Sequence, residues 1–215
     1  MTSPANPSPI HERFAELLRE CPMIAILRGI TPAETGGICD ALHRAGVRLL
    51  EIPLNSPDAC ESIRIAAEKT AGRMLVGAGT VLTEDEAARV ADAGGTFVIS
   101  PNVDVGVIRA TKSMGLVSIP GFFSPTEAFA ALGAGADYLK LFPAGRLGVG
   151  YVRDIQAVVK APIFAVGGVD VGNIGEFLRC CAGAGIGGAL YRPGRSAEDI
   201  AMEAQRFLKA MAAMS

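Results

Sequence analysis

Histidine is scarce in this 215-residue sequence: only His11 and His43 are present, both away from the segments where we expect reactive groups. No cluster of histidine with carboxylates or cysteines is available to bind zinc or iron. No Ser-His or Cys-His nucleophile can be assembled either. We therefore expect no metal ion, and we interpret both histidines as ordinary surface residues.

Cysteine pairs, charge excess and long apolar runs are also missing. The five cysteines form no CxxC pair and leave an odd one, which favours free thiols in a reducing cytoplasm. The 20 basic and 22 acidic residues give a net charge of −2, which argues against nucleic-acid partners and a polybasic membrane surface. No apolar run approaches the roughly 18–20 residues of a membrane span. The first nine residues do not resemble a signal peptide, so we expect a cytoplasmic protein.

What the sequence does contain is a regular succession of short apolar runs. Eight of them begin near Met23, Arg48, Met74, Thr96, Leu116, Asp137, Pro162 and Gly185. Several are followed by a helix-start signature in which Ser or Thr precedes Glu by three residues, as in Thr31–Glu34, Thr83–Glu86 and Ser124–Glu127. Eight strand–helix units in one small domain predict an α/β fold, a (β/α)₈ TIM barrel; an open doubly wound sheet is the alternative.

A short helix is expected before the barrel. Ile10, Phe14, Leu17 and Leu18 fall on one helical face, which predicts an amphipathic helix packed against the body. The sequence thus divides into an N-terminal tail and helix over residues 1–21, with a mobile Ser/Pro/Asn-rich tail, and a barrel catalytic domain over residues 22–215.

Lys140 is the strongest candidate for chemistry. It stands between Leu139 and Leu141 in an apolar run, at the strand end where barrels gather their reactive groups. Burial disfavours an ammonium, and a lysine of lowered pKa is a nucleophile suited to Schiff-base formation with a ketone. The alternative is a lysine whose side chain extends outward from the strand end.

Glu51 is the matching carboxylate, at the end of the second apolar run. A desolvated glutamate near a lysine can exchange protons near neutral pH; a structural ion pair with Arg28 or Lys140 is the other interpretation. Gly167-Gly168 and Gly187-Gly188 follow the seventh and eighth strands, where barrels commonly bind phosphate, although tight turns would also explain them.

The sequence resembles the 2-keto-3-deoxy-6-phosphogluconate and -galactonate aldolases over nearly all of residues 22 to 210. The motifs that carry the resemblance are PMIAILRG (Pro22–Gly29), EIPLNSP (Glu51–Pro57), GAGTVL (Gly77–Leu82), LKLFP (Leu139–Pro143) and FAVGGV (Phe164–Val169). Two details resemble the galactonate branch: EIPLNSP lacks an extra arginine, and Val166 stands where the gluconate branch usually has threonine.

The resemblance implies a class I aldolase that cleaves 2-dehydro-3-deoxy-6-phosphogalactonate to pyruvate and D-glyceraldehyde 3-phosphate, works as a homotrimer and needs no cofactor beyond the imine on Lys140. It implies that Glu51 moves protons through a water. The substrate-binding residues would be Arg28, Thr80, Pro120 and Val166, with Thr80 near the carboxylate of the pyruvate half. Gly167, Gly168, Gly187 and Gly188 would bind the substrate as well, by holding its phosphate.

Two departures from the family concern the pocket. Gly188 replaces a serine that often bonds the phosphate, and Phe122 and Phe123 are bulkier than usual. Other interpretations remain open on the sequence alone. They are a gluconate-type or 4-hydroxy-2-oxoglutarate aldolase, a phosphosugar isomerase with Glu51 as base, and a barrel that only binds a phosphosugar.

Overall fold

The computed structural model describes residues 8–213, so the Ser/Pro/Asn-rich tail that was predicted to be mobile lies outside the described residues. The helices are α1 (Pro9–Glu20), α2 (Pro32–Ala45), α3 (Ala59–Thr70), α4 (Glu84–Asp92), α5 (Val105–Ser113), α6 (Pro125–Ala134), α7 (Ala144–Gln156), α8 (Ile174–Leu178) and α9 (Ala197–Ala212). The strands are β1 (Met23–Ile26), β2 (Leu49–Pro53), β3 (Leu75–Gly79), β4 (Phe97–Ile99), β5 (Val117–Ile119), β6 (Gly121–Phe122), β7 (Leu139–Leu141), β8 (Ile163–Val166) and β9 (Gly183–Ile186).

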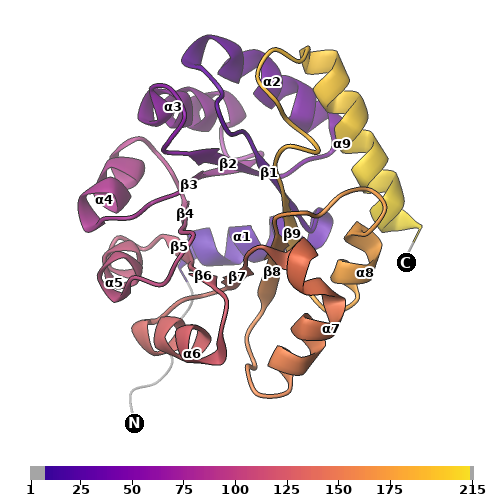
Figure 1. Cartoon of the computed structure of the whole chain (residues 1–215). Helices are drawn as coiled ribbons and strands as arrows, with labels where there is room; N and C mark the ends of the chain where they lie inside the picture. The colour runs from indigo at the N-terminus through magenta and orange to yellow at the C-terminus, as the bar shows by residue number, and fades with distance from the viewer. Residues whose placement is uncertain (1–7, 214–215) are drawn as a thin grey trace.

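The strands form a parallel barrel surrounded by helices, which confirms the predicted fold (Figure 1). Their order is β5-β4-β3-β2-β1-β9-β8-β7-β6. β5 and β6 are one stretch of chain divided at Pro120, which has no N–H to give to the ladder. Across this gap the N–H of Lys140 donates to the Pro120 carbonyl at 2.8 Å, and the N–H of Tyr138 donates to the Ser118 carbonyl at 3.2 Å. The predicted fifth strand therefore accounts for two of the nine.

The last strand begins earlier than the sequence predicted, at Gly183 instead of Gly185. Its first residues are glycine and alanine, which carry no β-branched signal. A Cβ on Gly183 would lie only 2.6 Å from the ring of Phe164, so close packing requires glycine at this position. Glycine is not typical of strands, which is why the sequence did not indicate where this strand begins.

Three helices, α2, α4 and α6, begin at the capping motifs that the sequence predicted. Complete capping boxes join Thr31 to Glu34, Thr83 to Glu86 and Ser124 to Glu127. Helix α2 ends at Gly46, whose φ of 107° lies in the left-handed region that glycine adopts easily. No helix within residues 8–213 is long and apolar enough to cross a membrane.

Helix α1 closes the amino-terminal end of the barrel, and Figure 1 shows it crossing behind the barrel's centre. Its buried residues Phe14, Leu17 and Leu18 join the apolar cluster formed by the strands' inward side chains. The Phe14 ring lies 5.4 Å from that of Phe97 and 6.4 Å from that of Phe164. The predicted packing of an amphipathic helix against the body is confirmed, and only the opposite end of the barrel is left open.

The N-terminal turn of α1 is tied down by a polar cluster. His11 Nε2 lies 2.6 Å from Lys112 Nζ and 3.3 Å from Asp137 Oδ1, and Lys112 also donates to Asp137 at 2.6 Å. His11 is therefore a half-buried anchor, where the sequence suggested an ordinary surface residue. His11 and Lys112 are about a hundred residues apart in the chain, so no local sequence pattern predicts their contact.

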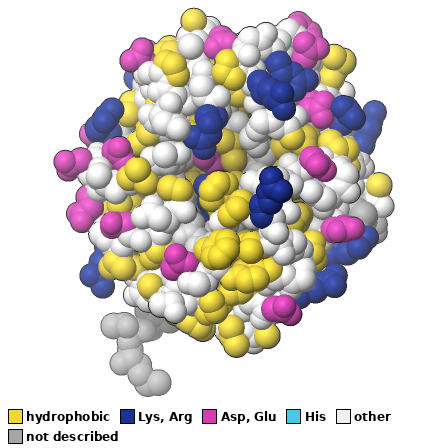
Figure 2. Space-filling model, in the orientation of Figure 1, with side chains coloured by type: hydrophobic (Ala, Val, Ile, Leu, Met, Phe, Trp, Pro, Cys, Tyr) yellow, Lys and Arg dark blue, Asp and Glu magenta, His cyan; other side chains and the backbone are white. Residues whose placement is uncertain are grey.

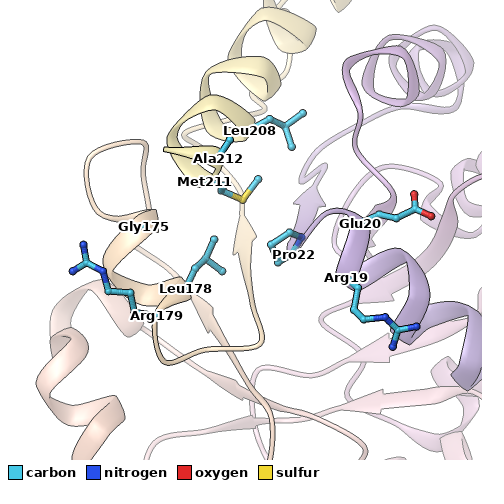
Figure 3. A pocket seen from close by; sticks show the side chains of 9 residues that line it. All are labelled: Arg19, Glu20, Pro22, Gly175, Leu178, Arg179, Leu208, Met211 and Ala212. Carbon is cyan, nitrogen blue, oxygen red and sulfur yellow. The ribbon is translucent and has the colours of Figure 1, made fainter. Parts of the chain in front are cut away.

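A hollow of about 460 Å³ lies at the same end of the molecule, between α1, α8 and α9 (Figure 3). Leu178 and Met211 form its apolar part, and Arg19 and Arg179 stand on its two sides. Pro22, which precedes β1, is part of its wall, so this hollow is separated from the carboxyl ends of the strands by the full barrel.

Candidate active site

The carboxyl ends of the strands open onto a cavity of about 740 Å³. Residues that line it include Arg28, Glu51, Thr80, Pro101, Lys140, Phe142, Val166, Gly167, Gly168, Asp170, Gly187, Gly188, Ala189 and Arg192. Nine of the ten predicted site residues are in this set. The tenth, Pro120, does not line the cavity; its carbonyl accepts the backbone N–H of Lys140 within the barrel wall.

Lys140 lies in the middle of β7 with its side chain in this cavity, only 6% exposed. Burial lowers the pKa of its amine; nearby Glu51 raises that pKa and Arg28 lowers it. The ammonium position is 5.2 Å from the centre of the Phe142 ring. No carboxylate in the described part of the chain forms an ion pair with Lys140. The lysine therefore points inward, and its amine is not held in an ion pair.

Glu51 faces the same cavity from β2 and is 1% exposed. Burial raises the pKa of its carboxyl, against the opposing charges of Lys140 and Arg28. Its Oε2 has no hydrogen-bond partner among the described residues. The structure thus does not show the ion pair that was the other interpretation of Glu51. A buried, unpaired carboxyl of raised pKa is suited to accept and return a proton.

Gly79, at the end of β3, makes room for Glu51. The two strands pair in parallel, and a Cβ built on Gly79 would overlap Oε1 of Glu51. The Glu51 carboxylate therefore packs directly against the backbone of Gly79, and a side chain at this position would displace the carboxylate.

Arg28 and Thr80 occupy the ends of β1 and β3. The Arg28 guanidinium donates to Asn55 Oδ1 at 2.7 Å, which holds it on the cavity side of the second strand's loop. Thr80 has a φ of +58°, a left-handed conformation that β-branched residues rarely adopt and that costs about 1–3 kcal/mol. Strain of this size persists where the surrounding structure fixes it, as at binding sites.

The glycine loops after β8 and β9 form another part of the cavity wall. Gly167 and Gly168 have φ values of 85° and 75°, and the N–H of Gly145 donates to the Gly167 carbonyl at 2.7 Å. After β9, the N–H groups of Leu190 and Tyr191 donate to the Gly187 carbonyl and close a turn. No long helix begins directly at either loop, so a bound anion here would rely on backbone N–H groups and side chains.

Sequence reasoning missed Pro101, Phe142, Asp170 and Arg192 in this wall. Arg192 lies six residues beyond the end of β9, too far for a rule based on strand ends. Phe122 and Phe123, expected to reshape the pocket, do not line it: Phe122 is in the core. Phe123 is outside, with its ring 6.3 Å from that of Tyr151.

Fold and cavity together define a class of protein. A parallel α/β barrel whose open end holds a buried, unpaired lysine beside a buried carboxyl is built as an enzyme that uses an amine nucleophile and an acid/base group. No group of three or more His, Cys, Asp or Glu side chains within residues 8–213 is arranged to hold a metal ion.

Comparison with known proteins agrees with this class. The family model for KDPG and KHG aldolase matches residues 14–204, and the chain belongs to that family. It is 46% identical over 188 residues to a probable 2-dehydro-3-deoxy-6-phosphogalactonate aldolase of Rhizobium meliloti, covering 86% of this chain and 89% of the relative. It is 43% identical over 192 residues to the 2-dehydro-3-deoxy-6-phosphogalactonate aldolase of Escherichia coli, covering 88% and 94%.

A solved structure described as native KDPGal superimposes with a TM-score of 0.88 at 41% identity, covering 91% of this chain and 96% of that one. This chain is accordingly an aldolase, a carbon–carbon lyase, which removes isomerisation and simple phosphosugar binding as interpretations of the sequence.

Proposed function

We propose that this protein is a class I aldolase that cleaves 2-dehydro-3-deoxy-6-phosphogalactonate to pyruvate and D-glyceraldehyde 3-phosphate. The observation that carries the proposal is Lys140, an unpaired amine of lowered pKa buried in the cavity together with Glu51. The names of the relatives with 46% and 43% identity support the choice of substrate.

The chemistry follows from these two groups. The neutral amine of Lys140 attacks the C2 ketone, and loss of water leaves a protonated imine that draws electrons from C3. Glu51 takes the proton of the C4 hydroxyl, through a water, and the C3–C4 bond breaks. The aldehyde leaves, the resulting enamine is protonated at C3, and water hydrolyses the imine to release pyruvate. The imine supplies the polarisation that a metal ion would otherwise provide.

Val166 supports the galactonate configuration over its gluconate epimer. It ends β8 and lines the cavity, where its isopropyl group offers no hydrogen bond to the C4 hydroxyl. A threonine at this position would bind the gluconate configuration, and an unmade hydrogen bond costs about 1–3 kcal/mol. This corresponds to a preference in kcat/KM of roughly 5–150-fold for the galactonate epimer. Val166→Thr should shift the ratio toward gluconate; an unchanged ratio would remove this support.

We also propose a homotrimer in the cytoplasm. The family resemblance supports the trimer, together with large apolar side chains that remain exposed on the single chain. The five cysteines support the cytoplasm, since all are free thiols.

Imine trapping tests the mechanism. Borohydride added with pyruvate should inactivate the enzyme and leave a three-carbon adduct on Lys140, located by peptide mass spectrometry. Lys140→Ala should abolish the adduct and reduce turnover by several orders of magnitude. Lys160→Ala, which removes an exposed lysine bonded to the Gln156 carbonyl, serves as the matched control and should react like the wild type. An adduct on another lysine, or none at all, would overturn the proposal.

A further inference from the structure

The basic side chains that line the cavity do not all have a role at the reacting end of the substrate. These basic side chains are Arg28, Lys140 and Arg192. Lys140 is required as a neutral amine, and Arg28 lies near enough to influence the pKa of both Lys140 and Glu51. Lys140 and Arg28 are therefore assigned to the reacting end of the substrate, which carries the ketone and the carboxylate. Arg192 is left for a different part of the ligand.

Arg192 sits beside the turn that follows β9. Its Nε–H donates to the Gly188 carbonyl at 2.9 Å, which fixes the guanidinium against the Gly187-Gly188 loop. Its two terminal amino groups donate to no other group in the part of the chain that the structure describes. A guanidinium held through Nε presents its remaining N–H groups as a planar fork, the geometry that binds two phosphate oxygens at once.

The neighbouring residue holds this segment in place. Pro193 packs against the backbone of Gly29, where a Cβ would lie 3.0 Å from the proline ring. A following proline also restricts the backbone of Arg192. The backbone that carries Arg192 is therefore held in place, so binding an anion costs less conformational entropy than it would in a mobile loop.

A carboxylate, Asp170, also lines the cavity beyond β8. It is occupied by its own backbone: Oδ1 accepts the N–H groups of Gly172 at 2.8 Å and Asn173 at 3.2 Å. Gly188 contributes no side chain to balance the charge of an anion. Any dianion held at the glycine loops thus depends on Arg192 for its cationic partner.

We infer that Arg192 is the residue that binds the substrate's phosphate and selects phosphorylated over unphosphorylated substrates. The inference rests on the proposed function for the identity of that substrate. It assigns to Arg192 a binding role in which the guanidinium forms charge-assisted hydrogen bonds with phosphate oxygens, alongside the N–H groups of the glycine loops.

Kinetics on a matched substrate pair test the inference. Arg192→Gln should raise KM for 2-dehydro-3-deoxy-6-phosphogalactonate by about ten- to a hundredfold, as expected for a lost charged hydrogen bond. Its kcat/KM for the unphosphorylated sugar acid should change less than about threefold, because no phosphate contact is lost. Arg192→Lys, which keeps the charge without the fork, should give an intermediate loss.

Arg195→Gln is the matched control. Arg195 lies three residues further along and donates to the Leu190 carbonyl at 3.2 Å, but it does not line the cavity. Its removal takes away the same charge and a similar loop contact, and should leave the ratio of the two substrates unchanged. An equal loss on both substrates in Arg192→Gln, or a shifted ratio in Arg195→Gln, would overturn the inference.

A binding measurement separates this inference from the proposed function. Calorimetric titration with inorganic phosphate should show affinity weakened about tenfold or more in Arg192→Gln and unchanged in Arg195→Gln. If the enzyme fails to cleave the sugar acid yet phosphate binding depends on Arg192, the proposed function fails and the phosphate site stands. If cleavage occurs but phosphate binding is indifferent to Arg192, this inference fails alone.

Discussion

Glu51 is buried where its charged form is disfavoured, and this links stability to pH. Burial raises the pKa of Glu51 in the folded protein, against the opposing charges of Lys140 and Arg28. The native state therefore holds its proton more tightly than the unfolded chain, whose Glu pKa is about 4.3. Its contribution favours folding below that value and is lost as pH rises through the folded pKa.

Glu51→Gln should accordingly be more stable than the wild type at pH 8 and similar to it near pH 4. Each unit by which the pKa is raised adds about 1.4 kcal/mol to the difference. Urea unfolding at several pH values measures it, and repeating the pair in a Lys140→Met background removes the coupling to the amine. The exposed carboxylate Glu68, changed to Gln, is the control. A stability difference that is constant with pH would contradict the burial argument.

Gly79 should act as a positioning residue for Glu51. In Gly79→Ala the new methyl group overlaps the carboxylate, so we expect kcat to fall by about a hundredfold or more, on the order of a misplaced acid/base group. Imine trapping on Lys140 should persist, because the lysine itself is untouched. Gly133→Ala, whose Cβ meets nothing within 4 Å on helix α6, is the control and should keep full activity. Loss of trapping in Gly79→Ala would indicate a general collapse of the site.

Single residues differ in how visible they are in the sequence. Lys140 and Glu51 are visible because a charge inside an apolar strand has no structural reason to be there. Arg192 is not, because an arginine in a Pro- and Gly-containing loop is ordinary until the fold brings it to the cavity. The close approach of Gly79 to Glu51 depends on strand register, which only the paired strands reveal.

At the scale of elements, helix α1 covers the amino-terminal end of the barrel, and its contribution to stability can be measured separately from catalysis. Phe14 is fully buried among Phe97, Tyr138 and Phe164. Phe14→Ala should lower the free energy of unfolding by about 3–5 kcal/mol, the usual loss for a buried phenylalanine, as measured by urea unfolding. The exposed Val158, changed to Ala, should change stability little.

The milder Phe14→Leu variant tests whether the role of helix α1 is only structural. It should keep most of the stability, and its kcat/KM should equal that of the wild type, because the catalytic cavity opens at the other end of the barrel. A drop in kcat/KM without a change in stability would show that α1 influences the active site.

Elements whose signals are local were predictable. The capping boxes of α2, α4 and α6 lie within single turns of the chain, and all three are confirmed. Two features depend on partners far away in sequence and were missed. Pro120 divides the fifth strand because it has no N–H to donate to the neighbouring strand. Gly183 begins the last strand because the ring of Phe164 leaves no room for a side chain there.

For the whole molecule, the distribution of apolar surface bears on assembly. Figure 2 shows hydrophobic side chains gathered on the lower part of the visible face, over the region where Figure 1 places β6, β7, α6 and α7. Phe123 and Phe142 follow paired strands, and Phe129 lies on α6; these three are 51%, 43% and 52% exposed. Phe142 also lines the catalytic cavity, so a second chain seated on this apolar face would border the active site.

We therefore expect the wild type to sediment as a trimer of about 67 kDa, three times the 22.2 kDa of one chain. Placing charges in the apolar face, as in the double variant Phe123→Asp and Phe129→Asp, should dissociate the trimer, because an unpaired carboxylate is costly to bury at an interface. Met202→Asp changes an equally exposed residue on α9 and should leave the mass unchanged. Sedimentation equilibrium measures all three. A wild-type mass near that of one chain would refute the trimer, and dissociation by Met202→Asp would move the interface to the opposite side of the barrel.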